Sequence, residues 1–353
     1  MKPEQLLTLE SLDAVWREVS QNDSILIATH ERPDGDALGS LAAVRCVLAR
    51  EGHTVQMASI ETVPPGYEFL LPMLKNTDRP GERPRLLIAL DSDTPDRLIL
   101  PNNVSPAEIR DLSIVNIDHH STNTLYGMIN LVVPTASSTA ELVFHLLARN
   151  RKVIDKTVAE CLLVGIIEDT GRFQFERTSA DTLRVAASLV SRGVSMNELV
   201  DLVTKSHSIA SLHLWSDILA TAQGEADGRI VWAYLSSDML AKHDMRTNPG
   251  DIVNMLMQVE TCELAILFRE QDKDSVHVSL RATDKVDATE IARRFGGGGY
   301  PRTAGCVLRR PLSETVAQVL SVARQTVGVG DHQEAPGLAV AARRGKAGRL
   351  QHF

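Results

Sequence analysis

Residue types that can bind a metal ion are concentrated between His30 and Asp36, where one imidazole and two carboxylates occur close together. Asp34 and Asp36 flank Gly35, and a glycine there would let the backbone turn so that the two carboxylates diverge toward different metals. Gly39, one helical turn further on, would permit close packing of a helix. Considered alone, this segment fits an ordinary Asp–Gly turn beside a surface histidine equally well.

Two further polar clusters each follow a short apolar run of the sequence. Asp91 ends one such run, and the triplet Asp118-His119-His120 ends another. A carboxylate at the tip of a buried strand is costly unless it has a partner, although a structural cap is the better explanation of Asp91 considered by itself. Adjacent histidines beside an aspartate have no evident packing role, so this triplet favours a catalytic or metal-binding function.

A fourth cluster, Glu168-Asp169, is predicted at the end of an apolar helix rather than of a strand. Carboxylates at a helix C-terminus oppose the helix macrodipole by about 0.3–1 kcal/mol each, so a cation is expected there. Imidazole and carboxylate ligands without cysteine suit Mn²⁺, with Mg²⁺, Co²⁺ or Fe²⁺ as further candidates, better than a structural Zn²⁺. Two such ions would stabilise both the attacking and the leaving oxygen of an in-line phosphoryl displacement.

The elements that must position these clusters alternate between strands and helices. Apolar runs typical of strands occupy residues 24–29, 54–58, 86–90 and 114–117, and helical patterns occupy 37–50, 138–150, 155–167 and 179–193. In open α/β sheets, ligands bind outside the carboxyl ends of the strands, where three of the four clusters are expected. We therefore predict an α/β fold whose N-terminal, doubly wound, mainly parallel sheet domain covers residues 1–190 and carries the catalytic residues.

The rest of the chain is predicted to contain a helical connector at 191–224, a smaller α/β domain at 225–327 and a tail at 328–353. The second domain repeats the alternation of strands and helices. The tail is rich in Gly, Ala and Arg and lacks hydrophobic periodicity, which predicts disorder.

A second group of candidate functional residues lies in the predicted C-terminal domain. Arg281 closes a predicted strand, and Gly297, Gly298, Gly299 and Tyr300 follow the next predicted helix. Glycines let backbone N–H groups approach an anion or a base closely, and an arginine can bind a phosphate in bidentate fashion. By itself, the glycine run is as typical of a flexible hinge as of a binding loop.

Composition narrows the classes of function. The chain has 353 residues, of which 43% are hydrophobic and 23% charged, and these values exclude a disordered chain, a collagen and a coiled-coil rod. A net charge of −8 argues against a coat for long nucleic acid but allows a short anionic substrate in a local basic pocket. Four widely spaced cysteines and the lack of a bilayer-length apolar run predict a cytoplasmic protein without a membrane partner.

In order and spacing, the four clusters resemble those of the DHH phosphoesterase superfamily, and the resemblance extends over about residues 20–310. The residues that carry it are acids and histidines: His30, Asp34, Asp36, Asp91, Asp118, His119, His120 and Asp169. This combination is specific because four separate clusters must recur in the same order.

The resemblance assigns a role to each of these residues. It implies that His30 and Asp34 hold one Mn²⁺ ion and that Asp91 bridges this ion to a second. The second ion would have three further ligands: Asp36, His119 and Asp169. His120 would face the scissile phosphate, and Asp118 would orient a ligand by accepting a hydrogen bond.

The C-terminal domain resembles the substrate-binding domain associated with DHH proteins, which implies that Arg281 and the glycine run contact the substrate. The family usually has a histidine after the glycine run, at the position of Tyr300. A tyrosine can stack on a base and donate one hydrogen bond, but it is not cationic at neutral pH. Phosphate affinity or substrate choice is therefore expected to differ from the family norm.

Within the superfamily, the layout is similar to the bacterial nanoRNase/pAp phosphatase group. This similarity implies a cytoplasmic enzyme, with a homodimer expected, that hydrolyses very short RNAs or 3′-phosphoadenosine 5′-phosphate (pAp) by in-line attack of a bound hydroxide. The alternatives are a cyclic or linear dinucleotide phosphodiesterase, a pyrophosphatase or polyphosphatase, and a non-catalytic nucleotide sensor or RNA-binding protein. A glycine-rich clamp suits a nucleoside better than pyrophosphate, and the complete ligand set argues against a sensor.

Overall fold

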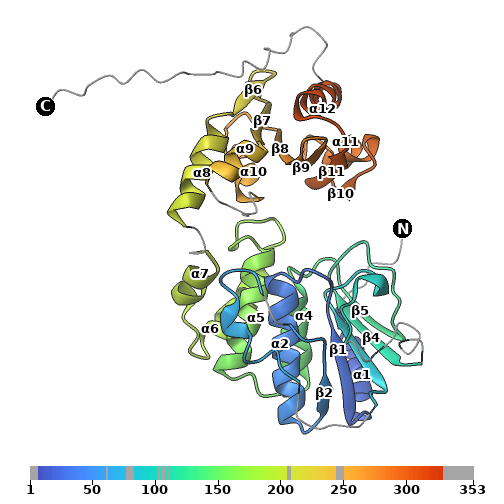
Figure 1. Cartoon of the computed structure of the whole chain (residues 1–353). Coiled ribbons are helices and arrows are strands. Elements are labelled where there is room, and N and C mark those ends of the chain that lie inside the picture. Colours follow the sequence, from blue (N-terminus) through green and yellow to red (C-terminus); the bar gives the residue numbers. More distant parts are fainter. Residues whose placement is uncertain are drawn as a thin grey trace, which may run out of the picture. The chain divides into compact units, whose positions relative to one another are not determined.

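The computed structural model shows two compact units, Met1–Ser206 and His207–Phe353. It describes residues 7–60, 63–76, 83–101, 104, 109, 111–204, 208–243 and 250–328. Each unit is an α/β structure built around its own sheet (Figure 1), which confirms the predicted fold class. Apart from Gly328, the predicted tail at 328–353 lies outside the described residues.

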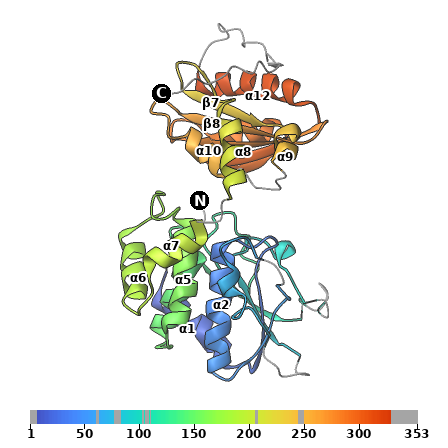
Figure 2. The ribbon, with the colours of Figure 1, turned by 60° about the vertical axis from the view of Figure 1, so that its left-hand side comes forward.

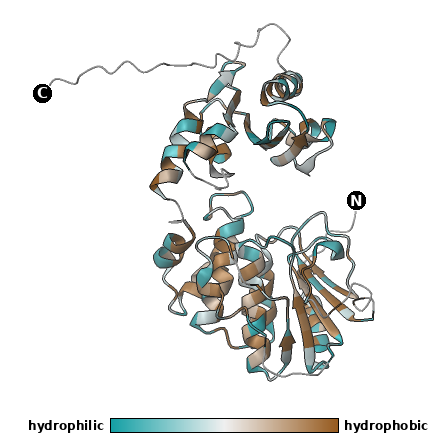
Figure 3. Ribbon diagram, viewed as in Figure 1, coloured by the Kyte–Doolittle hydropathy of each residue, from teal (hydrophilic) through white to brown (hydrophobic). Residues whose placement is uncertain are grey.

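The first sheet has five parallel strands in the order β2-β1-β3-β4-β5. Their bounds are Ser24–Ala28 for β1, Thr54–Gln56 for β2, Leu86–Leu90 for β3, Ser113–Asp118 for β4 and Ile129–Val132 for β5. Strands β1 and β3 are buried throughout and, apart from Ser24, consist of hydrophobic residues (Figure 3), as in a sheet covered on both faces. The strand order reverses between β1 and β3, the point at which open α/β sheets bind ligands.

Helices of the first unit cover one face of this sheet. They are α1 (Leu9–Ser20), α2 (Gly35–Arg50), α4 (Thr139–Arg149), α5 (Lys156–Asp169), α6 (Ala180–Val190) and α7 (Met196–Thr204), with short 3₁₀ helices at Glu68–Leu70 and Pro95–Arg97. Their apolar side chains pack with Ile25 and Ile88 of the sheet in the main hydrophobic core. Residues of the opposite face, such as Leu26 and Leu87, are covered by side chains between Leu98 and Tyr126.

Helices α2 and α5 cross in close contact because glycines lie between them. A Cβ atom on Gly39 of α2 would lie only 2.3 Å from the carbonyl oxygen of Cys161 in α5. Protein interiors are close-packed and leave no room for such an atom, so this position requires glycine. The prediction that Gly39 permits close helix packing is confirmed.

The predicted turn at Gly35 is wrong. Helix α2 begins at Gly35, and Asp34 caps it by accepting the backbone N–H groups of Asp36 and Ala37 at 3.1 Å each. The two aspartates diverge because one caps the helix and the other lies in its first turn. Gly35 is required for space instead, since a Cβ atom there would lie 2.7 Å from Cε1 of Tyr67.

The second sheet has six strands in the order β10-β11-β9-β8-β7-β6, with β7 and β8 parallel and the other neighbours antiparallel. The strands are β6 (Gln223–Glu225), β7 (Ile230–Leu235), β8 (Leu264–Asp272), β9 (Ser275–Ala282), β10 (Gly298–Tyr300) and β11 (Thr303–Leu308). The helices are α8 (Ile209–Leu219), α9 (Ser237–Lys242), α10 (Gly250–Leu256), α11 (Ala288–Arg294) and α12 (Leu312–Val327). Helices α11 and α12 pack on one face, and α8 and α10 pack on the other (Figure 2).

The two helices predicted as a connector pack in different units. Leu199 of α7 belongs to the core of the first unit, whereas Leu214 of α8 packs with Val231 in the second. The boundary between the units therefore falls between α7 and α8, inside the predicted range 191–224. Within the described residues, every helix is too short or too polar to cross a lipid bilayer.

Candidate metal centre

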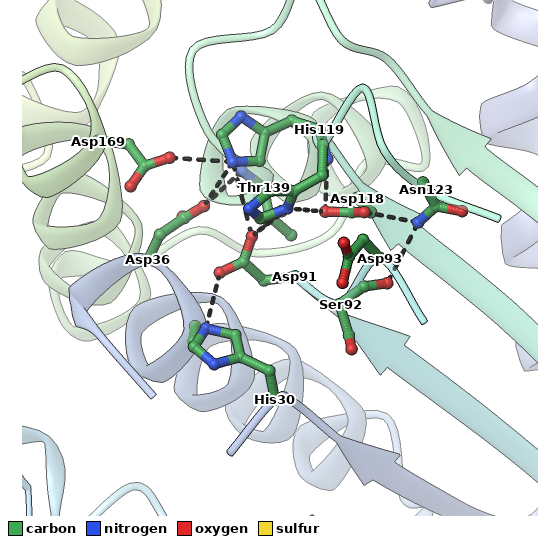
Figure 4. Close-up of polar contacts among 12 residues, drawn as sticks. His30, Asp36, Asp91, Ser92, Asp93, Asp118, His119, Asn123, Thr139 and Asp169 are labelled. Atoms are coloured by element: carbon green, nitrogen blue, oxygen red, sulfur yellow. Dashed lines mark hydrogen bonds and ion pairs between the residues drawn. The ribbon is translucent and has the colours of Figure 1, made fainter. Parts of the chain in front are cut away.

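The four predicted clusters come together at the carboxyl ends of β1, β3 and β4 and at the end of α5 (Figure 4). In three groups of residues, the candidate ligand atoms all lie within 4.8 Å of one another. These groups are His30 with Asp34 and Asp91; Asp36 with His119 and Asp169; and Asp91 with His119 and His120. Because Asp91 and His119 each belong to two groups, the three groups form one continuous cluster.

His30 is buried, and its ring is oriented by the backbone. Nδ1 lies 2.8 Å from the carbonyl oxygen of Glu31, which can only accept, so Nδ1 donates its proton there. Nε2 then points to Oδ2 of Asp91 at 3.5 Å and to Oδ1 of Asp34 at 4.0 Å. A ring held in this way has the tautomer that a metal ligand needs, because its second nitrogen is free to bind a cation.

His119 occupies the centre of the second group. Its Nε2 lies 2.9 Å from Oδ2 of Asp169, 3.6 Å from Oδ1 of Asp91 and 4.0 Å from Oδ2 of Asp36. Asp169 is the last residue of α5, and Asp36 is in the first turn of α2. One imidazole therefore faces carboxylates from a strand end and from two helix ends.

The N-terminus of α4 holds two of these carboxylates in place. Asp36 accepts backbone N–H groups from Thr139 at 2.6 Å and from Ala140 at 2.9 Å, and the Thr139 hydroxyl donates to Asp91 at 2.9 Å. The positive end of the helix dipole stabilises anions at this position. Sequence reasoning missed Thr139, although the expected N-cap at Ser138, which is present, places the start of α4 there.

A chain of buried hydrogen bonds orients His120. Its Nδ1 lies 2.7 Å from Oδ1 of Asp118, and Oδ2 of Asp118 accepts from Nδ2 of Asn123 at 2.5 Å. Asn123 also donates to the backbone carbonyl oxygen of Ser92 at 3.1 Å, which ties the loop after β4 to the end of β3. Asn123 is a second residue that sequence reasoning missed, because a single asparagine in a predicted loop carries no motif.

Mutual repulsion and burial disturb the carboxylates of the cluster. Burial, reinforced by the charges of Asp91 and Asp169, raises the pKa of Asp36 well above its usual range. The same causes raise the pKa of Asp34 to about 6, although 45% of its side chain stays exposed. Burial would also raise the pKa of Asp91, but the hydrogen bond with His30 and the charges of the nearby histidines lower it to about 2.

The histidines show the complementary effect. Burial lowers the pKa of His120, but its hydrogen bond with Asp118 and the surrounding carboxylates outweigh burial and raise it to about 9. The pKa values of His30 and His119 are also raised, against burial, by their hydrogen bonds with Asp91 and Asp169. The cluster thus attracts positive charge, and its converging nitrogen and oxygen atoms fit divalent metal ions.

In the second unit, the predicted glycine run forms most of β10, an edge strand. Cβ atoms on Gly297 and Gly299 would lie 2.1 Å and 2.4 Å from carbonyl oxygens of β11, so close pairing of the two strands requires both glycines. Gly298 is exposed, and a Cβ atom there would meet nothing within 4 Å. Strand pairing therefore explains the glycines at positions 297 and 299, whereas a side chain would fit into open space at position 298.

Arg281 and Tyr300 lie on one face of the second sheet. Arg281 of β9 is directly opposite Thr303 of β11, and Thr303 is opposite Tyr300 of β10. Directly opposed residues of antiparallel strands point to the same face. The guanidinium of Arg281 is held by Oδ1 of Asn254 at 3.1 Å and is partly buried, which lowers its pKa.

Comparisons with known proteins find family models and relatives that match most of this chain. A model described as the DHH family, N-terminal domain, matches residues 24–166, and a model of the DHHA1 domain matches residues 239–328. The bifunctional oligoribonuclease and PAP phosphatase NrnA of Thermus thermophilus is 33% identical over 85% of this chain and 89% of its own length. The cyclic-di-AMP phosphodiesterase PdeA of Listeria monocytogenes is 22% identical over 87% of this chain and 48% of its own.

Among solved structures, an exopolyphosphatase-related protein from Bacteroides fragilis superimposes with a TM-score of 0.80. The match covers 91% of this chain and 97% of that protein, at 22% sequence identity. At this level of identity, the likeness concerns the fold alone.

Proposed function

Because the chain belongs to the DHH phosphoesterase family, whose members are metal-dependent hydrolases, we propose that it hydrolyses short oligoribonucleotides, pAp or both. The observation that carries this proposal is the convergence of the four clusters into one site with ligand atoms within 4.8 Å. The similarity to the Thermus thermophilus oligoribonuclease and PAP phosphatase supports the substrate class. A cytoplasmic location and a homodimer stay predictions.

The metal ligands are proposed to be divided between two Mn²⁺ sites. His30 and Asp34 would hold one ion, and Asp91 would contact both ions. The other ligands of the second ion would be Asp36, His119 and Asp169. When bound, such a pair of ions lowers the pKa of a water molecule and neutralises the charge that develops on the phosphoryl group.

The side chains around the ligands would position the reaction. Asp118 accepts the Nδ1–H of His120, which would turn Nε2 of that ring toward the scissile phosphate, where it donates a hydrogen bond when the ring is protonated. Thr139 holds Asp91, and the N-terminus of α4 donates two backbone N–H groups to Asp36, which favours its charged form against the burial that raises its pKa. These residues thus prepare the site before the substrate enters.

We assign substrate binding to the second unit and catalysis to the first. Arg281 would bind a phosphate, Tyr300 on the same face would stack on a base, and the backbone of Gly297, Gly298 and Gly299 would border the pocket. The open space at Gly298 supports the close approach of a ligand to the backbone at that point. A pocket of this kind favours small substrates over long strands.

Rate measurements with Mn²⁺ test the proposal. The substrates are pAp, RNAs of two to about ten nucleotides and cyclic di-AMP, and we expect a steep preference for the smallest ligands. Chelation of the metal should abolish turnover, and Mg²⁺, Co²⁺ and Fe²⁺ should be compared with Mn²⁺ at equal concentration. Turnover of long RNA at the rate of dinucleotides, or turnover of neither pAp nor short RNA, would contradict the proposal.

A cyclic or linear dinucleotide phosphodiesterase is the second candidate, because this chain is also similar to PdeA. The same proposed metal ligands could catalyse that reaction. The chain spans 48% of PdeA, so the likeness leaves half of that protein without a counterpart. Product analysis on cyclic and linear di-adenylate separates the two candidates. Opening of the cyclic substrate without hydrolysis of pAp would favour the second.

A further inference from the structure

The loop that follows the metal ligand Asp169 reverses the chain tightly. Gly171, Arg172 and Phe173 have consecutive left-handed φ values of 54°, 63° and 65°. The Thr170 hydroxyl accepts the backbone N–H of Phe173 at 3.0 Å, which fixes the turn. Non-glycine residues rarely adopt this conformation, and such backbone costs persist where the surroundings impose them, often at functional sites.

This turn brings Arg177 back to the metal cluster. Nη1 of Arg177 lies 3.2 Å from Nδ1 of His119, whose other ring nitrogen faces Asp169 at 2.9 Å. A guanidinium only donates hydrogen bonds and carries five N–H donors in a planar fork that matches a phosphate. Nδ1 of His119 can accept from Arg177 only while it carries no proton. When Nε2 binds a metal ion, Nδ1 carries the proton instead, so the guanidinium is available to a phosphate oxygen beside the cluster.

The charge of the cluster creates a need for such a cation. Five carboxylates belong to it, those of Asp34, Asp36, Asp91, Asp118 and Asp169. Two divalent ions bring four positive charges, so the loaded centre would keep one negative charge when its histidines are neutral. An anionic phosphate ester binds such a centre poorly unless another cation lies beside it.

Phe175 of the same loop presents an aromatic ring to solvent. Its side chain is 52% exposed, and its ring packs against the loop backbone, where a Cβ atom on Gly171 would lie 2.5 Å from Cζ. Single exposed hydrophobic residues are common and need no explanation by themselves. Here Phe175 lies six positions after the proposed metal ligand Asp169 and two positions before Arg177. An exposed aromatic ring and a cationic side chain therefore occur in one short loop.

We propose that residues 170–178 form a nucleotide-binding loop of the first unit. Arg177 binds a non-bridging oxygen of the phosphate ester, and Phe175 stacks on a base next to that phosphate. The pair would recognise a nucleotide at the metal cluster itself, independently of Arg281 and Tyr300. The assignment of a base to Phe175 rests on the proposed function, whereas the phosphate contact of Arg177 does not.

Arg177→Ala and Arg177→Lys test the phosphate contact in the full-length, Mn²⁺-loaded protein. The alanine variant should raise the KM for the dinucleotide pApA by about tenfold or more and weaken the inhibition by inorganic phosphate to the same extent. The lysine variant should restore part of both losses. Arg184→Ala, which removes an exposed arginine from α6, should change neither. Mn²⁺ affinity measured by calorimetry should be retained in all variants.

A loss of Mn²⁺ affinity without a change in phosphate inhibition would overturn the assignment, because it would mean that Arg177 only positions His119. Wild-type phosphate inhibition in the alanine variant would overturn it as well. Inorganic phosphate is the probe here because calorimetry can measure its binding to the Mn²⁺-loaded protein without any turnover, whatever the natural substrate is. Failure of the proposed function would appear separately, as inactivity of the wild-type protein toward both pAp and pApA.

Phe175→Ala tests the stacking role with pApA and with an abasic form of the same dinucleotide. The variant should have a kcat/KM for pApA that is on the order of tenfold lower, whereas its kcat/KM for the abasic substrate should not change. Phe175→Trp, which keeps an aromatic ring, should have the wild-type kcat/KM for pApA. Leu183→Ala on α6 is the control, because its side chain is equally exposed, at 52%. An equal loss on both substrates, or no loss on either, would show that Phe175 contacts no base.

Discussion

A methyl group on Gly165 would lie 2.5 Å from Oδ1 of Asp36 and 2.7 Å from Cβ of Ala140. Gly165 is on α5, one turn before Asp169, and the other two residues begin α2 and α4. The point at which these three helices meet is therefore also the point at which Asp36 and Asp169 approach His119. The distance between the two carboxylates depends on the lack of a side chain at one helical position.

Gly165→Ala should consequently damage the metal centre as well as the packing. Extra atoms in a well-packed core cost about 1–3 kcal/mol, and here the nearest atom to be displaced belongs to Asp36, a proposed metal ligand. We expect a lower melting temperature and a loss of Mn²⁺ affinity, measured by calorimetric titration. Ala187→Ser, on the exposed side of α6, adds one atom and should alter neither; unchanged affinity in the glycine variant would contradict the argument.

Asp91→Asn should abolish turnover while the protein stays folded. The φ value of Asp91 is 56°, a conformation that asparagine tolerates better than alanine, so the backbone is preserved. Partners that only support a ligand cost about 10–100-fold when mutated, and a ligand shared by two groups should cost more. Asp93→Asn is the matched control, since Asp93 pairs with Arg97 at 3.0 Å instead. Near-normal turnover of the Asp91 variant would refute the two-metal assignment.

Asn123→Ala should reduce kcat by about 10–100-fold with little change in Mn²⁺ affinity. The reason is that Asn123 contacts Asp118, which orients His120, and neither of these is proposed as a metal ligand. Steady-state kinetics and metal titration of the same preparation measure both quantities. Asn130→Ala, which removes an asparagine that binds the backbone of Gly127, is the control. A parallel loss of metal affinity would count against this role.

The metal-free protein should lose stability as the pH rises. The folded structure raises the pKa values of four groups above the usual values of their residue types: His30, His119, His120 and Asp34. The folded state therefore binds more protons than the unfolded state. Stabilisation by such groups is present at low pH and is lost as the pH rises through the raised pKa values, from about 6 for Asp34 to about 9 for His120.

Mn²⁺ should therefore stabilise the protein more at pH 8.5 than at pH 5.5, because it competes with fewer protons. Melting temperatures with a chelator and with saturating Mn²⁺ at both pH values measure the effect, and each kcal/mol corresponds to about 2–4 °C for a unit of this size. The lowered pKa of Asp91 has the opposite effect, a loss of stability as the pH falls, but this effect is confined to strongly acidic solutions. A metal-induced shift that is larger at pH 5.5 would be the opposite of this expectation.

Tyr300→His should lower the KM for pAp, because an imidazole can take a positive charge near phosphate whereas a phenol stays neutral. Tyr300→Phe separates the contributions, since it keeps the aromatic ring and removes the hydroxyl. Comparison of kcat/KM for pAp, pApA and cyclic di-AMP measures both affinity and preference. If the histidine variant keeps the wild-type values for all three, the position does not govern selectivity.

Sequence reasoning could bring the candidate metal ligands together because parallel strands end at one edge of their sheet. The apolar runs before His30, Asp91 and Asp118 identify such strands, so their first polar residues had to meet. The prediction of a turn at Gly35 was wrong for a physical reason. Asp34 caps α2, and the sequence Asp34-Gly35-Asp36 is as compatible with the start of a helix as with a turn. The short motif therefore indicated which residues lie at the cluster but not the conformation of their backbone.

Other features depend on contacts that the local sequence does not encode. Thr139 and Arg177 reach the cluster only because α4 and the loop after α5 are brought to it by the packing of whole helices. The glycine run appears as a loop in the sequence, yet Gly299 belongs to an edge strand because it pairs with Ala304 of β11. Such pairings are long-range properties that no single segment can reveal.

The order in which the ligands occur along the chain has a consequence for biosynthesis. His30 is made early, but Asp169 emerges from the ribosome only after nearly the whole first unit. Domains generally fold as units during translation, so a nascent chain that ends within α5 holds several histidines and aspartates but no complete centre. A chain that ends before Asp169 would therefore lack part of the candidate metal centre and, with it, the metal-dependent hydrolysis proposed for that centre.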